Sequence, residues 1–320
     1  MADLPFIAAV DAGIHQEMKR DPRVLYFGQN MATTENHEFV AAYGPDRVRV
    51  TPISETAEIG IAIGAAMAGL RPVVELYMAE FMLVAMDQVV NEANRFRYMS
   101  GGQVKVPLVL KAGFGFTAGW AGQHTGSLTS LFMGVPGLKV VVPSTAADAK
   151  GLMATAIRDD NPVVFLHHYM LTLEHGDVPD GEHLVPFGKA VVRRAGGDVS
   201  IVATGWMVHR ALAAAERLAA EGISAEVIDP RTVAPLDLET IFGSVEKTRH
   251  VVLVDQGTRH ASVGAIIASE LAEHRFSALA APIAQVTARD TTIPYSEPLE
   301  AYVIPDVERI AAAVRSVLRR

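Results

Sequence analysis

The sequence predicts an α/β protein with two domains, each built on a doubly wound, mostly parallel sheet. Short apolar and β-branched runs alternate with helix-periodic segments along the whole chain, which is the pattern of strands joined by crossover helices. The length of 320 residues exceeds what one hydrophobic core usually serves. Residues 174–187 are rich in Gly, Asp, Pro and His and follow neither period, so we place one domain at 1–180 and the other at 181–320.

In the first domain, a strand at 48–50 leads into a helix that begins at Glu55, with Ser54 as its expected N-cap. A second helix is predicted over 146–157, after a Ser144-Thr145 cap. The other strands predicted in this domain are continuous apolar runs, at 106–110, 138–142 and 162–166.

The second domain begins a new cycle with a strand at 199–205 and an alanine-rich helix at 208–220. Three further strands are predicted, at 225–229, 251–255 and 283–287. The last helix follows Pro305-Asp306 and places four apolar residues on one face: Val307, Ile310, Val314 and Val317. Right-handed crossovers make each half an open doubly wound sheet.

The composition excludes several classes of function. The net charge of −8 and the lack of a Lys/Arg run argue against nucleic-acid binding. The absence of cysteine excludes disulfides, thiolate catalysis and thiolate metal sites. The longest apolar stretch, 59–70, is too short and glycine-rich to span a bilayer, and residues 1–5 show no secretory signal. We therefore expect a cytoplasmic protein that binds neither nucleic acid nor membrane.

Two residues are candidates for chemistry. Glu55 lies where a strand turns into a helix, at the edge where α/β proteins bind ligands, although an acid in a first turn also complements the helix dipole. His124 lies in a loop, where a histidine serves as acid or base, or is simply a surface residue. The preceding Gly113-Phe114-Gly115 is not a dinucleotide fingerprint, because the third glycine is misplaced. It predicts a loop, either beside an active site or at the surface.

Other polar and aromatic residues favour packing over ligand binding. His167, His168 and His175 lack the spacing of a metal site. Aromatic residues spaced along helices are mostly core residues, and four of them occur between residues 75 and 99: Tyr77, Phe81, Phe96 and Tyr98.

Short segments along the chain match one known family in their order. They are TPISE at 51–55, GAAMAGLRPVVE at 64–75, DQVVNEA at 87–93, YMSGGQ at 98–103, PGLKVVVPS at 136–144, AIRDDNPVV at 156–164, EVIDPRT at 226–232 and IPYSEPLE at 293–300. In this order the chain resembles the β subunit of the thiamine-diphosphate-dependent 2-oxo-acid dehydrogenases, which include the pyruvate, branched-chain and acetoin dehydrogenase first components. The resemblance covers nearly the whole chain.

The resemblance implies a thiamine-diphosphate pyrimidine-binding domain at 1–180 followed by a transketolase C-terminal-like domain. It implies that Glu55 contacts the aminopyrimidine ring of thiamine diphosphate and that His124 faces the reacting intermediate, so these two are the expected catalytic residues. Phe81 is expected to pack against the aminopyrimidine, with Tyr77 and Ile53 in the same pocket. The family's potassium site, built largely from backbone oxygens, would fall at Leu108, Ala156, Ile157, Asp159 and Asn161.

The resemblance also implies that this chain is incomplete alone. The sequence lacks the Gly-Asp-Gly motif, followed by a later Asn, that binds magnesium and diphosphate in resembling enzymes. In the family this motif lies on the α subunit. We therefore expect a tetramer of two α and two β chains, with magnesium held mainly by α, and a dihydrolipoyl acyltransferase core as a further partner.

Three functions stay open. In the first, a 2-oxo acid is decarboxylated and its acyl group passes to a lipoyl acceptor. In the second, a carboligase forms an acyloin or a transketolase-like product without an acyltransferase. The second is favoured by departures from the family pattern near His124, at Thr125-Gly126, and in docking regions, at Ala280 and Arg319-Arg320. In the third, the chain is a non-catalytic scaffold, and the retained candidate residues argue against it. The sequence names neither donor nor acceptor.

Overall fold

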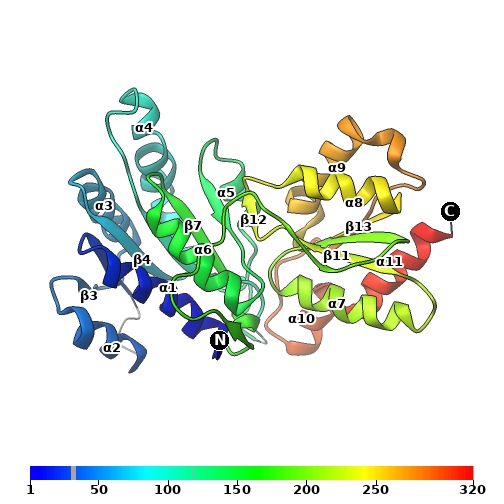
Figure 1. Ribbon diagram of the computed structural model, residues 1–320, viewed down its shortest axis with the longest axis horizontal. Helices are drawn as coiled ribbons and strands as arrows, with labels where there is room; N and C mark the ends of the chain where they lie inside the picture. The colour runs from blue at the N-terminus through cyan, green and yellow to red at the C-terminus, as the bar shows by residue number, and fades with distance from the viewer. Residues whose placement is uncertain (30–33, 118, 320) are drawn as a thin grey trace. The chain divides into compact units, whose positions relative to one another are not determined.

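The computed structural model describes residues 1–29, 34–117 and 119–319, which form two compact units (Figure 1). The first unit comprises residues 1–114 and 132–187, and the second comprises residues 115–131 and the chain from Gly188 onward. The segment that carries His124 belongs to the second unit, whereas the sequence placed it in the first domain. Within the described ranges, no helix has both the length and the apolar character needed to cross a membrane.

The first unit is built on a parallel sheet, which confirms the predicted fold class. Its strands lie in the order β6 (Lys139–Val141), β7 (Val163–His168), β5 (Val109–Phe114), β4 (Arg71–Met78), β2 (Val24–Gly28) and β3 (Val48–Val50). Strands β2 and β4 were not predicted from the sequence. Strand β4 carries Glu75 in its middle, and this acid interrupts an otherwise apolar run.

Helices pack on this sheet and on one another. Helix α1 (Phe6–Arg20) packs on α6 (Ala146–Arg158), and α3 (Glu55–Met67) packs on β4 and on the 3₁₀ segment η1 (Ala79–Ala85). The predicted cap of α6 is confirmed, since the Thr145 hydroxyl accepts a hydrogen bond from the Asp148 amide at 3.3 Å. Ser54 stands at the N-cap position of α3, but its side chain makes no capping bond.

Part of the segment expected to be irregular, 174–187, forms a strand. Strand β8 (His175–Val178) pairs antiparallel with β1 (Ala2–Pro5) at the N-terminus of the chain. A strand of four residues is too short to show a clear alternation of side chains, so the sequence pattern did not predict β8. The remaining short elements up to this point are α2 (Thr34–Tyr43), the π-helical η2 (Gln88–Asn94), α4 (Phe96–Met99), α5 (Thr129–Met133) and η3 (Tyr169–Leu171).

The second unit contains the other sheet. Its strands lie in the order β14 (Ala284–Ala288), β13 (Val251–Thr258), β10 (Val199–Ala203), β11 (Ala225–Asp229) and β9 (Val191–Arg194), and only β9 runs antiparallel to its neighbour. Figure 1 shows the helices on its two faces, which are α7 (Trp206–Ala219) and α11 (Val307–Leu318) on one and α8 (Leu238–Thr248) and α9 (Val263–His274) on the other. The remaining elements are β12 (Thr232–Ala234), η4 (Arg259–Ala261), η5 (Phe276–Ala278) and α10 (Glu297–Val303).

The last helix follows the predicted amphipathic pattern. Asp306 caps α11 by accepting a hydrogen bond from the Arg309 amide at 2.7 Å. Ile310, Val314 and Val317 are buried in the core between α11, α7 and the sheet. The apolar face predicted for residues 307–317 therefore contributes to the core of the second unit.

Candidate functional site

Glu55 is the first residue of α3 and lies at the carboxyl edge of the parallel sheet. Strand β3 ends at Val50, and the Thr51 amide then donates to the Gly28 carbonyl at the end of β2, 3.0 Å away. The chain turns here into α3, so Glu55 occupies the edge at which open parallel sheets bind ligands. The Glu55 side chain is only partly buried.

A second acid one turn later fixes the start of α3. Glu58 is 2% exposed and accepts hydrogen bonds from the Gln29 amide group, at 2.9 Å, and from the Thr51 hydroxyl. Because Gln29 follows β2 and Thr51 follows β3, Glu58 ties the first turn of α3 to the ends of two strands. The sequence analysis missed Glu58 and its bond from Gln29. The available signal was an acid at the i+3 position on the buried face of an apolar helix.

The predicted pocket residues lie on elements that pack against this turn. The Thr56 hydroxyl donates to the Val84 carbonyl at 3.3 Å, so the first turn of α3 contacts η1, which carries Phe81. Tyr77 lies near the end of β4 and is one-third exposed, and Ile53 precedes α3 and is 80% exposed. The structure therefore brings Glu55 and Phe81 onto two packed elements and leaves Ile53 at the surface.

Apolar side chains are exposed along α3 and η1. Val84 is 68% exposed, Ile61 is 63% exposed, and Leu83 and Met67 are each nearly half exposed. Helix α3 has no charged residue after Glu58. A helix that is apolar on all sides is typically buried by a second element. This surface has the character of a contact surface for another chain.

A buried ion pair lies inside the same sheet. Glu75 of β4 accepts a hydrogen bond from the Tyr26 hydroxyl at 2.8 Å and pairs with Lys111, its neighbour in register on β5. His167 is the penultimate residue of β7 and is buried. Burial, the Lys111 charge and His168 hold the pKa of His167 well below its usual value. His167 is therefore a neutral imidazole, and among the described residues its Nδ1 atom has no hydrogen-bond partner.

The glycine at 113 has a packing role. A Cβ atom at Gly113 would lie 2.2 Å from the Tyr169 ring, which packs over this end of β5. The Tyr169 hydroxyl donates to the Tyr77 carbonyl at 3.3 Å, and burial raises the pKa of Tyr169. The close approach of a ring explains this glycine without any nucleotide.

His124 lies in a closed loop of the second unit. The Gly115 amide donates to the Gly126 carbonyl at 3.2 Å, which joins the two ends of the loop. Inside it, the His124 amide and the Thr125 hydroxyl both donate to the Ala121 carbonyl, at 3.2 and 2.5 Å. His124 is partly buried. The two predicted catalytic residues thus belong to different units.

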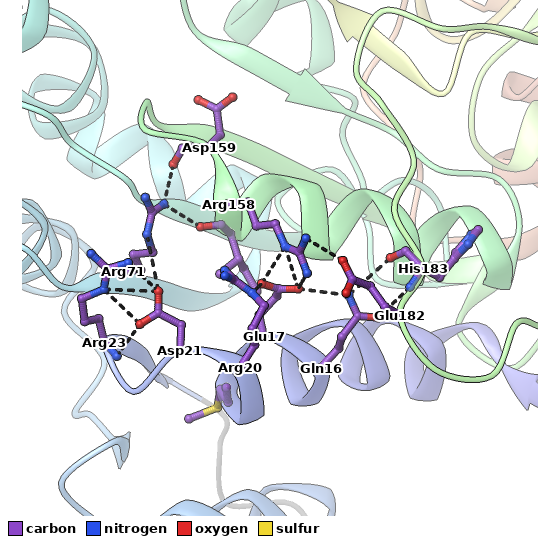
Figure 2. Close-up of polar contacts among 12 residues, drawn as sticks. Gln16, Glu17, Arg20, Asp21, Arg23, Arg71, Arg158, Asp159, Glu182 and His183 are labelled. Atoms are coloured by element: carbon purple, nitrogen blue, oxygen red, sulfur yellow. Dashed lines mark hydrogen bonds and ion pairs between the residues drawn. The ribbon is translucent and has the colours of Figure 1, made fainter.

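The five oxygens expected to bind potassium lie around the C-terminus of α6. Figure 2 shows Arg71, whose Nη1 atom donates to the Ile157 carbonyl at 2.9 Å and to the Asp159 carbonyl at 3.0 Å. The Leu108 and Ala156 carbonyls accept from the amides of Val163 and Asp159. The Asn161 side-chain oxygen accepts from Arg97 at 2.7 Å.

Carbonyl oxygens are the kind of donor that a monovalent cation accepts, but the positive charges of Arg71 and Arg97 already lie on three of the five oxygens. Each backbone carbonyl has two lone pairs, and the dipole of α6 favours a cation at its C-terminus. Arg71 already bonds two of these oxygens, so a bound potassium would share them with the guanidinium. Among the described residues, no group of three or more His, Asp or Glu could hold a metal ion.

The proposed docking positions lie at the surface of the second unit. Ala280 is exposed, and its amide donates to the Arg249 carbonyl at 2.9 Å. Arg319 follows α11, and Arg320 lies outside the described residues.

Comparisons with known proteins match both halves of the chain. Residues 3–172 match the family model described as "Transketolase, pyrimidine binding domain", and residues 188–310 match "Transketolase, C-terminal domain". A solved structure described as "Split gene transketolase, inactive beta4 tetramer" superposes with a TM-score of 0.81 at 24% identity, covering 98% of this chain and 97% of that chain. At this identity, the likeness supports the fold alone.

Relatives of known function are more similar in sequence. The acetoin:2,6-dichlorophenolindophenol oxidoreductase subunit beta of Cupriavidus necator is 44% identical over 327 residues, with 97% of this chain and 96% of that protein covered. The pyruvate dehydrogenase E1 component subunit beta of Rickettsia conorii is 43% identical over 314 residues, with the same two coverages.

Proposed function

Because the chain belongs to the family of β subunits of thiamine-diphosphate-dependent 2-oxo-acid dehydrogenases, we propose that it acts with an α chain to decarboxylate a 2-oxo acid and pass the acyl group to a lipoyl acceptor. The observation that carries the proposal is the position of Glu55 at the carboxyl edge of the first sheet, fixed from below by Glu58. The reaction class is inferred from the relatives, and Glu55 is the residue that we propose as the centre of the site.

The residues around Glu55 fit the aminopyrimidine end of thiamine diphosphate. When bound, this cofactor supplies a nucleophilic carbon and an electron sink for decarboxylation. Glu55 would hold a proton at a ring nitrogen of the aminopyrimidine, and Phe81 would pack against the ring face. Ile53 is 80% exposed, so a covering chain that buries it also removes water from the Glu55 carboxyl. A hydrogen bond to that carboxyl is stronger in such a setting.

His124 completes the proposed catalytic pair. A histidine in a structured loop can donate a proton to a developing oxyanion or withdraw one, because its ordinary pKa lies near neutrality. The closed loop between Gly115 and Gly126 limits the positions that the imidazole can reach. We propose that His124 holds or moves a proton at the substrate oxygen.

The partner is an α chain that carries the diphosphate and magnesium site, in a tetramer of two α and two β chains. The sequence has no Gly-Asp-Gly motif of its own. The exposed apolar side chains on α3 and η1 give a partner a surface beside Glu55. A monovalent potassium ion at the C-terminus of α6, sharing carbonyls with Arg71, is part of the same proposal.

A carboligase is the second candidate. Ala280, where many family members carry an acid for acyltransferase docking, is an exposed alanine, so an electrostatic contact with a basic core is lost there. In this case the donor fragment passes to an aldehyde or ketone, giving an acyloin or a transketolase-like product.

One experiment separates the candidates. The chain is coexpressed with an α-like chain and supplied with pyruvate, branched 2-oxo acids or sugar ketoses, together with an artificial electron acceptor or, separately, an aldehyde. Reduction of the acceptor without carbon–carbon product supports the dehydrogenase, and a carbon–carbon product supports the carboligase. Full activity of the Glu55→Gln tetramer would leave only a scaffolding role.

A further inference from the structure

A buried carboxylate in the second unit faces the backbone of the loop that carries His124. We propose that Glu300 is a positioning residue, which holds this loop so that His124 meets the substrate. The inference rests on the proposed function, because the role of His124 belongs to that function. The His124 loop is defined here as residues 115–117 and 119–126.

Both oxygens of Glu300 are bonded to the loop. Oε1 accepts a hydrogen bond from the Thr117 amide at 3.1 Å, and Oε2 accepts one from the Gly119 amide at 2.8 Å. Glu300 is only 2% exposed. A carboxylate taken out of water is costly unless donors replace its hydration, and charge-assisted bonds to backbone amides are stronger than neutral ones. The loop amides are therefore part of what stabilises this charge inside the protein.

Glu300 itself has little freedom to move. It lies in α10, where its amide donates to the Ser296 carbonyl at 2.8 Å and its carbonyl accepts from the Ile304 amide at 3.2 Å. Val303 and Ile304, which follow, are buried at 3% and 1% exposure. The carboxylate thus projects from a short helix that is anchored in the core of the second unit.

The contacts of the loop divide into a base and an arm. At the base, the Gly115 and Gly126 backbones are joined, and Phe116 is buried in the core of the second unit with the Arg210 guanidinium 5.0 Å from its ring centre. In the arm, the amides of Thr117 and Gly119 bond to Glu300, just before the turn that carries His124.

The turn also packs closely on the segment before α10. A Cβ atom at Gly122 would lie 2.0 Å from the Thr292 side chain, so a larger residue there would require Thr292 to move. The segment from Thr292 to Glu300 therefore contacts the loop at two places. Because the base is held independently by Phe116, loss of the Glu300 bonds should release the arm and leave the core intact. A displacement of about 1 Å at a catalytic group can cost on the order of 100-fold in rate.

The test uses the complete complex with its α chain and does not depend on catalysis alone. Amide hydrogen exchange of peptides that contain residues 117 and 119 is compared between the wild type and Glu300→Gln. The glutamine keeps one acceptor oxygen but turns its NH₂ group toward a backbone donor. Glu297→Gln is the matched control, since Glu297 is exposed on the same helix. We expect faster loop exchange in Glu300→Gln and wild-type exchange in the control.

Kinetic measurements test whether Glu300 acts through His124. We expect Glu300→Gln to lower kcat by about 10- to 100-fold with KM changed less than about 3-fold, because positioning is lost while binding contacts remain. In a His124→Ala background the same substitution should add less than about 2-fold. Equal effects of Glu300→Gln in both backgrounds would show a general structural role and overturn the proposal.

Two further outcomes are distinguishable. Unchanged exchange at residues 117 and 119 in Glu300→Gln overturns the positioning role and leaves the proposed function standing. Wild-type turnover of His124→Ala on every donor overturns the catalytic role of His124 and, with it, the link to Glu300. If Glu300→Gln fails to assemble, Glu300→Asp is measured in its place. That variant keeps the charge and shortens the reach by one methylene, and loss of kcat is again expected.

Discussion

Glu58 lies one helical turn after Glu55 in α3, and the two acids face different surroundings. Glu58 is buried beneath the helix start and accepts bonds from Gln29 and Thr51, whereas Glu55 is partly exposed at the sheet edge. Replacement by glutamine should therefore lower the catalytic rate at position 55 and the stability of the fold at position 58.

Glu55→Gln in the complex with the α chain should lower kcat by about 100-fold or more, which is the usual contribution of a positioned acid or base. Its melting temperature should stay close to wild type, because Glu55 supports no buried contact that the fold requires. Steady-state turnover and calorimetry of the same preparation check both parts. A stable, fully active variant would remove Glu55 from the mechanism.

Glu58→Gln should instead destabilise the protein by about 1–3 kcal/mol, since one of the two oxygens that accept from Gln29 and Thr51 would become an NH₂ group. Denaturant unfolding of the chain gives this free energy directly. Activity per folded complex should fall far less than in Glu55→Gln. The opposite ranking of the two variants would mean that Glu58, rather than Glu55, is the functional acid.

Glu17 and Arg158 join α1 to α6 and should make stability depend on pH. Burial alone would raise the pKa of Glu17, but hydrogen bonds from Arg158, Gln16 and Arg20 outweigh it, and the folded pKa lies below the ordinary 4.5 (Figure 2). The stabilisation is therefore complete above pH 4.5 and is lost as the pH falls through the lowered value.

In Glu17→Gln, the free energy of unfolding should fall less steeply between about pH 5 and pH 3 than in wild type. This is the pH range in which such a carboxylate becomes protonated and its stabilisation is lost. Glu182→Gln is the control, because Glu182 bonds the same arginine from an exposed position. Arg158→Met should cost about 1–3 kcal/mol at neutral pH, because buried Glu17 loses its bonds from Arg158 while Gln16 and Arg20 still bond it. Parallel acid slopes for Glu17→Gln and wild type would contradict this assignment.

Potassium should stabilise the protein through the carbonyls at the C-terminus of α6. The melting temperature should rise with the logarithm of potassium concentration above the dissociation constant, and an equal concentration of sodium should act less. Arg71→Met should lower the melting temperature in both salts, because Arg71 bonds Ile157 and Asp159 directly. Identical melting in the two salts would mean that Arg71 alone satisfies this helix end.

The sequence predicted the elements whose pattern is local. Continuous apolar runs identified β7 and the start of β5, which runs over Val109–Phe114 and not over the predicted 106–110, and the face of α11 followed from its period. Strand β4 was missed because Glu75 interrupts it, and only the structure shows that Lys111 on the next strand balances this acid.

The sequence likewise revealed some residues of the candidate site and not others. Glu55 could be singled out because its segment is contiguous and matches a family. Glu58 and Glu300 were not singled out, because their bonds to Gln29 and to the Thr117 and Gly119 amides join positions that are 29 and more than 180 apart along the chain. The hydrogen bonds of a carboxylate to distant groups leave no local pattern in the sequence, so this part of its role depends on the fold.

The apolar surface on α3 should be the contact for the α chain, and Ile61→Glu tests it. Ile61 is 63% exposed, so the substitution should leave the chain folded, with an unchanged melting temperature when it is expressed alone. Placing a charge in an interface that is buried on assembly costs several kcal/mol, and copurification with a tagged α chain should be lost. Val192→Glu, on the exposed side of β9 in the second unit, is the matched control and should copurify normally. If Ile61→Glu still assembles while losing turnover, the α3 surface contributes to the cofactor pocket without holding the partner.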